Sequence, residues 1–366
     1  MTPIGRLTTT GDLRLSLAPQ LTQISIMVSV FDQPRRDRPI GGPPARGGSH
    51  PPVAIAALVP TERMTFMDTA QLEKIRSSRG FFAALDQSGG STPRALAEYG
   101  ITEGRYSSDD EMFDLVHAMR TRLVSSPVFD GSRILAAILF EQTMERDMRG
   151  VPTGQYLWNE KQVVPFLKVD KGLTDEQHGV QLMKPIDTLD ELLKRANRHG
   201  MFGTKMRSVI KDADNDGVTA IVDQQFEYGA RIRAAGLVPV LEPEVSIASP
   251  HKGDAETLLR RALETHIEAL PDDATIVLKL TIPTQPGLYA ALAADRRVLR
   301  VLALSGGYSR DEACALLAMD SSMIASFSRA LLEGLSDKQT DEQFNRQLDA
   351  SIAQIFEASV QKSPGI

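Results

Sequence analysis

The chain has 366 residues, 42% of them hydrophobic and 24% charged, and its formal net charge is -6 at pH 7. Such a chain can build a sizeable core, and its negative charge gives no support to binding of nucleic acid or of an anionic membrane. The single cysteine, Cys314, excludes an intrachain disulfide and is expected to be an inert core thiol. No apolar run reaches the roughly 20 residues of a membrane span. We therefore expect a cytoplasmic enzyme.

The first 63 residues differ from the rest of the chain. Residues 41–52 are rich in glycine and proline, a composition that cannot form a packed core. We expect residues 1–63 to be a disordered extension. Two origins fit it: an organelle transit peptide, because the segment is poor in acids, or a start codon assigned upstream of Met64 or Met67. A cap signal at residues 68–71 indicates that the folded unit begins there, so residues 64–366 form the predicted domain.

Eight apolar, strand-like runs follow in this domain. They lie at residues 81–86, 134–140, 165–170, 202–207, 238–244, 276–281, 298–304 and 323–329. Helical patterns separate them, at 111–123, 187–197, 218–235 and 255–270 and after a capping box of Ser309 and Glu312. Strand and helix alternating eight times predict parallel βα units, and the domain is long enough for a (β/α)8 TIM barrel, which needs roughly 250 residues.

A doubly wound open sheet is the rival architecture. It would want a glycine-rich turn of the form GxGxxG after the first strand, and residues 86–93 lack that spacing. We prefer the barrel, whose active site lies at the C-terminal ends of the strands. Nearly every predicted strand carries an acid, a lysine, an arginine or a serine at that end.

Lys279 lies inside the sixth run, where an apolar strand makes a buried cation costly. Desolvation lowers the pKa of a lysine, and a neutral amine is a nucleophile toward carbonyls. Lys279 is therefore a candidate Schiff-base lysine. The alternative is a strand-end lysine that extends into solvent.

Further polar pairs stand two residues apart and so point to one side of their strands. They are Lys168 with Asp170, Lys205 with Arg207, and Glu242 with Glu244. Each pair is expected to project toward one common space.

Two candidate phosphate sites flank this space. Ser305 and Gly306 precede a helix and Arg329 ends the eighth run, in the region where barrels commonly bind phosphate. A second anion site could form from serines after the first strand together with a lysine. Its residues are Ser88, Ser91 and Lys168. Two phosphate sites beside a reactive lysine suggest a bisphosphorylated sugar.

Metal-binding patterns are weak. The six histidines show no metal-ligand spacing, which gives a zinc mechanism little support. Asp212, Asp214, Asp216, Gly217 and Asp223 match most of a calcium loop, but a strand precedes them where an EF-hand needs a helix. A turn that caps the following helix is the favoured reading.

Seven segments together resemble class I fructose-1,6-bisphosphate aldolases, closest to the bacterial form. They are residues 83–91, 168–172, 205–207, 242–244, 278–279, 304–307 and 326–329. The match runs from about Met67 to the C-terminus. The resemblance implies a lyase that reversibly cleaves fructose 1,6-bisphosphate into dihydroxyacetone phosphate and glyceraldehyde 3-phosphate in glycolysis and gluconeogenesis.

The resemblance also implies the catalytic roles. Lys279 would form an imine with C2 of the ketose, and this imine would accept electrons when the C3–C4 bond breaks, with no metal and no other cofactor. Glu242 would be the acid/base of imine formation, and Asp86 would handle the C4 hydroxyl proton and assist the imine. Lys205 would supply positive charge that keeps Lys279 neutral and stabilises developing oxyanions.

The remaining site residues follow from the same resemblance. Arg207 would bind substrate and, with Glu244 and Ser326, orient the catalytic groups. The ligands of the two phosphates would be Ser305, Gly306 and Arg329 for one, and Ser88, Ser91 and Lys168 for the other.

Two positions depart from the family pattern. The last tyrosine is Tyr308, whereas vertebrate members carry a functional tyrosine at the extreme C-terminus, and Ser328 stands where animal sequences use glycine. The alternatives are another Schiff-base barrel, such as a transaldolase or a deoxyribose-phosphate aldolase, and a catalytically silent barrel that acts as a binding protein. The partner expected is a phosphorylated sugar, and a homo-oligomer is compatible with the sequence.

Overall fold

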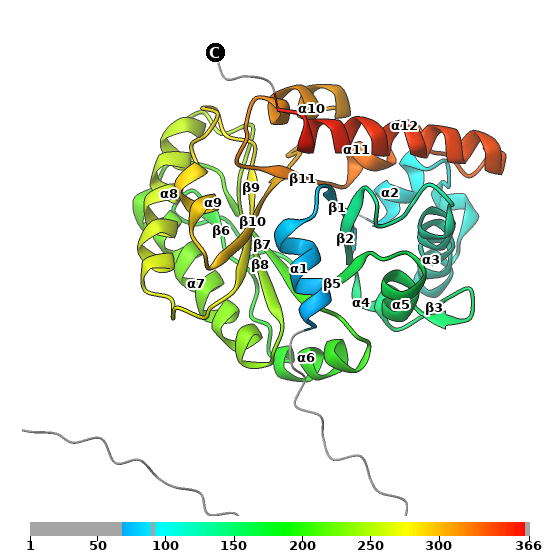
Figure 1. Cartoon of the computed structure of the whole chain (residues 1–366), viewed down its shortest axis with the longest axis horizontal. Helices are drawn as coiled ribbons and strands as arrows, with labels where there is room; N and C mark the ends of the chain where they lie inside the picture. The colour runs from blue at the N-terminus through cyan, green and yellow to red at the C-terminus, as the bar shows by residue number, and fades with distance from the viewer. Residues whose placement is uncertain (1–67, 89–91, 363–366) are drawn as a thin grey trace, which may run out of the picture. The chain divides into compact units, whose positions relative to one another are not determined.

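The computed structural model describes residues 68–88 and 92–362 (Figure 1). The expectations for residues 1–63, for Ser91 and for the last four residues lie outside this part of the chain. Within the described residues, no helix is both long and apolar enough to cross a membrane.

Eight parallel strands form a closed sheet. They are β1 (Phe81–Leu85), β2 (Ile134–Leu139), β5 (Val164–Lys168), β7 (Gly203–Ile210), β8 (Val238–Val245), β9 (Ile276–Thr281), β10 (Val298–Leu304) and β11 (Ile324–Phe327). Each strand pairs with the next in this order, and β11 pairs back onto β1. A two-residue strand, β6 (Val180–Gln181), runs antiparallel to the end of β7, and β3 (Asp147–Met148) pairs with β4 (Val151–Pro152) outside the barrel. The predicted (β/α)8 TIM barrel and its eight strands are confirmed.

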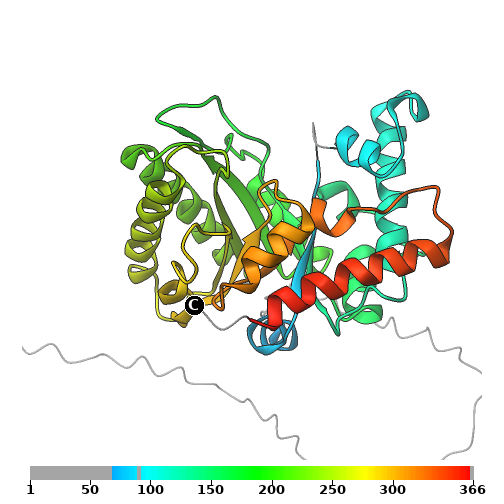
Figure 2. The ribbon, with the colours of Figure 1, turned by 90° about the horizontal axis from the view of Figure 1, so that it is seen from above.

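Helices surround the ring of strands (Figure 2). The α-helices are α1 (Thr69–Ser77), α2 (Thr92–Glu98), α3 (Asp109–Ser125), α4 (Glu141–Met144), α5 (Thr153–Gln155), α6 (Leu189–Arg198), α7 (Asn215–Ala234), α8 (Lys252–Glu268), α9 (Ala290–Ala294), α10 (Arg310–Ala318), α11 (Arg329–Leu332) and α12 (Asp341–Val360). Short segments of other helix types are η2 (Glu103–Arg105) and η3 (Tyr156–Glu160).

Local sequence signals explain where several helices begin. The Asp68 carboxylate accepts the backbone N–H groups of Ala70 and Gln71 at the start of α1, as predicted. Asp214 accepts the Gly217 N–H at 2.8 Å and caps α7. The calcium-like motif is therefore a helix cap, the reading that the sequence favoured.

Ser309 supports only half of the predicted capping box. Its hydroxyl accepts the Glu312 N–H at 3.3 Å and so caps α10. The described hydrogen bonds do not include the reciprocal contact from the Glu312 side chain. Arg329 also differs from its prediction: β11 ends at Phe327, and Arg329 is the first residue of α11. The prediction failed because the apolar run 323–329 continues into a helical turn.

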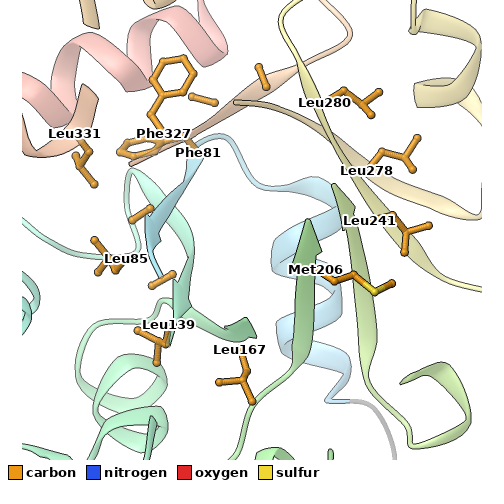
Figure 3. Close-up of a cluster of buried hydrophobic side chains, with 14 of the residues drawn as sticks. Phe81, Leu85, Leu139, Leu167, Met206, Leu241, Leu278, Leu280, Phe327 and Leu331 are labelled. Atoms are coloured by element: carbon orange, nitrogen blue, oxygen red, sulfur yellow. The ribbon is translucent and has the colours of Figure 1, made fainter. Parts of the chain in front are cut away.

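Strand side chains alternate between the helices and the barrel interior. Those that face the helices form a continuous core, part of which Figure 3 shows. It includes Phe81, Leu85, Leu139, Leu167, Met206, Leu241, Leu278, Leu280, Phe327 and Leu331. Cys314 of α10 is buried in the same core, and burial raises its thiol pKa to about 11, as an inert thiol requires.

The interior at the N-terminal ends of the strands is filled by what we call the apolar floor. It includes Ile75 of α1 with Phe82, Phe166, Val238, Val240 and Val277. The rings of Phe82 and Phe166 lie 5.5 Å apart. Gly203 leaves room for this packing, since a Cβ there would come within 2.5 Å of the Phe166 ring. The apolar floor closes the barrel at the N-terminal ends of the strands, so a site for chemistry can form only at the C-terminal ends.

Candidate active site

A cavity of about 750 Å³ opens at the C-terminal ends of the strands. All the predicted site residues that the structure describes line it, although they come from widely separated parts of the sequence. They are Asp86, Ser88, Lys168, Lys205, Arg207, Glu242, Glu244, Lys279, Ser305, Gly306, Ser326 and Arg329. Ser91 belongs to residues 89–91, outside the described part. A second cavity of about 670 Å³, between α3 and α12, contains none of these residues.

Four buried ionisable side chains form what we call the charged cluster. Lys279 Nζ lies 3.0 Å from Glu242 Oε1, and Lys205 Nζ lies 2.8 Å from Glu242 Oε2. Lys205 also lies 2.5 Å from Asp86 Oδ2. Lys279 is only 4% exposed, so its amine is removed from bulk water. Charges at such distances interact strongly because the surrounding protein screens them poorly.

The charges of the cluster set its protonation. Burial would raise the pKa of Glu242, but Lys205 and Lys279 outweigh burial and lower it. Burial would likewise raise the pKa of Asp86, and Lys205, followed by Lys279, lowers it. Burial would lower the pKa of Lys205, but Asp86 and Glu242 raise it above its ordinary value. Near neutral pH, the resting site therefore holds two carboxylates and a Lys205 cation.

Gln225 supports Glu242 from behind the sheet. It lies on α7, fully buried, and its Oε1 accepts the Glu242 backbone N–H at 2.9 Å. Its Nε2 donates to Ser208 Oγ at 2.6 Å. The sequence offered only a polar residue within a helical pattern, so neither Gln225 nor Ser208 could be linked to the site before β7, β8 and α7 were placed together.

The paired polar residues on β5, β7 and β8 meet as their spacing predicted. Lys168 Nζ lies 2.7 Å from Asp170 Oδ1, and it also donates to the Asp170 carbonyl at 2.8 Å. Arg207 Nε lies 2.5 Å from Glu244 Oε2. Burial would lower the pKa of Arg207, but Glu244 raises it, so Arg207 stays a cation at the cavity wall.

A glycine turn follows β10. Gly306 has φ 58° and Gly307 φ 124°, and the Tyr308 N–H closes the turn on the Ser305 carbonyl at 2.9 Å. These positive φ values are accessible to glycine at little cost. A Cβ built at Gly307 would lie 3.7 Å from an Arg329 guanidinium nitrogen, so the turn and Arg329 are neighbours.

Ser328, one of the two departures from the family pattern, has a structural role. Its φ is -110°, a value open to any L-residue, so the chain does not require glycine there. Its Oγ accepts a hydrogen bond from Gln87 Nε2 at 2.6 Å. This bond joins the exit of β1 to the turn before Arg329.

Other polar residues that line the cavity were not predicted. Arg94 of α2 lies 2.9 Å from Glu98, and Lys171 lies 2.7 Å from Glu141. Arg94 stands three residues after Ser91, and Lys171 stands three residues after Lys168. A search for cations just downstream of Ser91 and Lys168 could have found them.

The match to known proteins decides the family. The sequence model described as fructose-bisphosphate aldolase class-I matches residues 75–282, more than half of the chain. The chain belongs to the class I fructose-bisphosphate aldolase family. The resemblance predicted from its seven segments is thereby confirmed.

A bacterial relative agrees with this assignment. The chain is 58% identical over 290 residues to the fructose-bisphosphate aldolase class 1 of Synechocystis sp., an alignment that covers 79% of this chain and 97% of the relative. Among solved structures, fructose-bisphosphate aldolase from Plasmodium falciparum, crystallised with TRAP and a small-molecule inhibitor, superposes with a TM-score of 0.65. At 21% identity, over 81% of this chain and 94% of that one, it supports the fold alone.

Proposed function

We propose that this chain, a class I aldolase by family, cleaves fructose 1,6-bisphosphate reversibly into dihydroxyacetone phosphate and glyceraldehyde 3-phosphate through an imine on Lys279. The observation that carries this proposal is the position of Lys279, which is buried, lines the cavity and lies 3.0 Å from the Glu242 carboxylate. A carbonyl that enters the cavity would meet an amine with an acid/base partner already in contact.

Lys279 and Glu242 can generate nucleophile and acid in one step. Transfer of a proton from Lys279 Nζ to the Glu242 carboxylate yields a neutral amine and a carboxylic acid. The amine adds to the C2 carbonyl of the substrate. The acid then protonates the carbinolamine hydroxyl, which leaves as water, and the iminium remains on Lys279.

Asp86 and Lys205 suit the cleavage step. The Asp86 carboxylate, ionised in the resting site, would take the proton of the C4 hydroxyl. The electrons of the C3–C4 bond would then move to the iminium, which becomes a neutral enamine, while C4 becomes the aldehyde of glyceraldehyde 3-phosphate. Lys205, 2.5 Å from Asp86, would hold that carboxylate in place and stabilise developing negative charge. In this scheme the iminium is the electron sink, so no step calls on a metal.

The two phosphates would occupy opposite sides of the cavity mouth. The Ser305–Gly306 turn with Arg329 would bind the phosphate near the ketone carbon, and Ser88 with Lys168 would bind the other. Ser91, which follows Ser88 in the sequence, is proposed for the second site on the family resemblance. Arg207 would bind substrate, while Glu244 and Ser326 would orient the catalytic groups.

The proposed catalytic unit is residues 64–366, and the proposed location is the cytoplasm. The family match begins at residue 75, and every proposed catalytic residue lies between Asp86 and Lys279. A shortened chain that starts at Met67 should keep the melting temperature and kcat of the full chain. A loss of several degrees would show that the first 63 residues belong to the folded unit.

The direct test is a cleavage assay with the purified chain. We expect equal amounts of dihydroxyacetone phosphate and glyceraldehyde 3-phosphate from fructose 1,6-bisphosphate, at a rate that EDTA does not change. Fructose 6-phosphate with erythrose 4-phosphate, and 2-deoxyribose 5-phosphate, serve as substrates for the other Schiff-base barrels. Faster turnover of either one, or loss of cleavage on chelation, would overturn the proposal.

A further inference from the structure

Arg120 is a buried arginine that lies outside the proposed catalytic machinery. It belongs to α3 and is only 2% exposed. One guanidinium nitrogen donates to the Gln87 carbonyl at 2.5 Å, and the other donates to Thr143 Oγ1 at 2.7 Å. These acceptors follow β1 and β2, so Arg120 joins the exits of two neighbouring strands. It is not among the residues that line the cavity.

The charge of Arg120 is costly where it lies. No carboxylate oxygen among residues 68–88 and 92–362 lies within 4.0 Å of its guanidinium, whose Nε is also buried without a hydrogen-bond partner. Burial lowers the pKa of Arg120 to about 10, and attraction to the charge of Asp86 only partly opposes this. An apolar residue of similar size would pack there at lower cost. The two hydrogen bonds therefore indicate that Arg120 has a role beyond packing.

Those hydrogen bonds fix the segment that carries Asp86. The Gln87 carbonyl, which Arg120 holds, is one residue beyond Asp86. The Gln87 side chain is held as well, because its Nε2 donates to Ser328 Oγ at 2.6 Å. The segment is thus pinned through its backbone by α3 and through its side chain by the turn before α11. The Asp86 carboxylate lies at the end of this support, 2.5 Å from Lys205.

We propose that Arg120 is a positioning residue for the cleavage step, which holds the Asp86–Gln87 backbone so that the Asp86 carboxylate stays within reach of the C4 hydroxyl. This inference rests on the proposed function of Asp86. Lysine cannot replace arginine here, because a single ammonium on a flexible stem lacks the planar fork that reaches both strand exits. Imine formation uses Glu242, in contact with Lys279, as its acid/base, so loss of this support is expected to slow cleavage far more than imine formation.

The test separates cleavage from imine formation. The variant Arg120→Lys should lower kcat for fructose 1,6-bisphosphate by about 100-fold, the loss expected when a reacting group is misplaced by about 1 Å. Its KM and its borohydride trapping with dihydroxyacetone phosphate on Lys279 should stay as in the parent chain. Thr143→Val removes only one acceptor and should lower kcat by about 10-fold.

Arg122→Lys is the matched control. It changes an arginine of the same helix that contacts Gln339 and Asp341 instead, and kcat should not change.

The outcomes are distinguishable. An unchanged kcat in folded Arg120→Lys would overturn the proposal. A parallel loss of cleavage and trapping in both Arg120→Lys and Thr143→Val would also overturn it, because that pattern indicates a general structural role. A drop in cleavage with intact trapping and a melting temperature close to that of the parent supports it. If the proposed function itself is wrong, the parent chain fails to cleave the bisphosphate or to trap on Lys279 before any variant is compared.

Discussion

The interior of the barrel has two layers with opposite chemistry, although the same strands build both. On β9, Val277 belongs to the apolar floor, and Lys279, two residues further on, belongs to the charged cluster. On β8 the same relation holds for Val240 and Glu242. Residues two positions apart on a strand point to the same side. Two positions along β8 or β9 therefore separate a side chain that packs in the apolar floor from one in the charged cluster.

This contrast indicates that the apolar floor provides stability and the charged cluster provides catalysis. The floor removes apolar surface from water and closes the barrel below the cluster. The cluster gathers two carboxylates and two lysines whose burial costs stability. Substitutions in the charged cluster should therefore lower kcat in a protein that stays folded. Substitutions in the apolar floor should lower the free energy of unfolding and leave kcat nearly unchanged.

The largest expected effect comes from removal of the nucleophile. Lys279→Met should lose essentially all cleavage of fructose 1,6-bisphosphate. The other amine of the cluster, Lys205, is held as a cation by Asp86 and Glu242, so it is not expected to form the imine that accepts the electrons of the C3–C4 bond. Steady-state kinetics and a thermal melt would measure this. The control Lys211→Met changes a partly exposed lysine that is paired with Glu176, and it should keep full activity. Substantial residual turnover in Lys279→Met would place the nucleophile elsewhere.

Glu242→Gln should come next in size. The amide keeps the shape of the side chain, and the backbone N–H can still donate to Gln225, but the group can no longer exchange a proton with Lys279. We expect imine formation to slow by roughly 10²–10⁴-fold, with KM largely kept. Rapid-quench trapping of the imine would measure the rate. A normal rate of imine formation would show that another group supplies the proton.

The phosphate contacts should give smaller losses with a distinctive pattern. Arg329→Ala removes a charge-assisted contact worth roughly 1.5–3 kcal/mol, so kcat/KM should fall by about 10- to 150-fold for fructose 1,6-bisphosphate and fructose 1-phosphate alike. Lys168→Ala should penalise the bisphosphate and leave fructose 1-phosphate nearly unchanged. Equal losses with both substrates in Lys168→Ala would assign Lys168 to the catalytic centre or, through its bond to Asp170, to the framework.

The floor should show the reverse behaviour. Phe166→Ala opens a cavity between the rings of Phe82 and Phe202, and it should destabilise the fold by about 3–5 kcal/mol. The turnover of the molecules that remain folded should be close to that of the parent chain. Denaturant melts and active-site titration would measure the two quantities. A large loss of kcat per folded molecule would mean that the two layers are mechanically coupled.

The layered pattern also explains what the sequence could predict. Apolar runs with a polar residue at or just past the C-terminal end predicted all eight strands, and they predicted the positions of Asp86, Glu242 and Lys279 in the cavity. The spacing works because both layers obey the same two-residue repeat. The family segments then added the roles that spacing alone cannot provide.

Supporting contacts that cross between elements were not predictable in this way. Gln225 and Arg120 act from helices, where a polar residue carries no signal of which strand it will contact. The end of the eighth strand was misplaced for a related reason, because the apolar residues around Arg329 serve a helix as well as they serve a strand. Such contacts follow from packing, which the alternation of hydrophobic residues does not encode.

The most direct test of this account is the site of the covalent adduct. The chain would be incubated with dihydroxyacetone phosphate, reduced with borohydride, digested and mapped by mass spectrometry. The account predicts one reduced adduct, on the peptide that contains Lys279, and none in Lys279→Met. An adduct on Lys205, on Lys168 or on any other lysine, or no adduct at all in an active preparation, would contradict it.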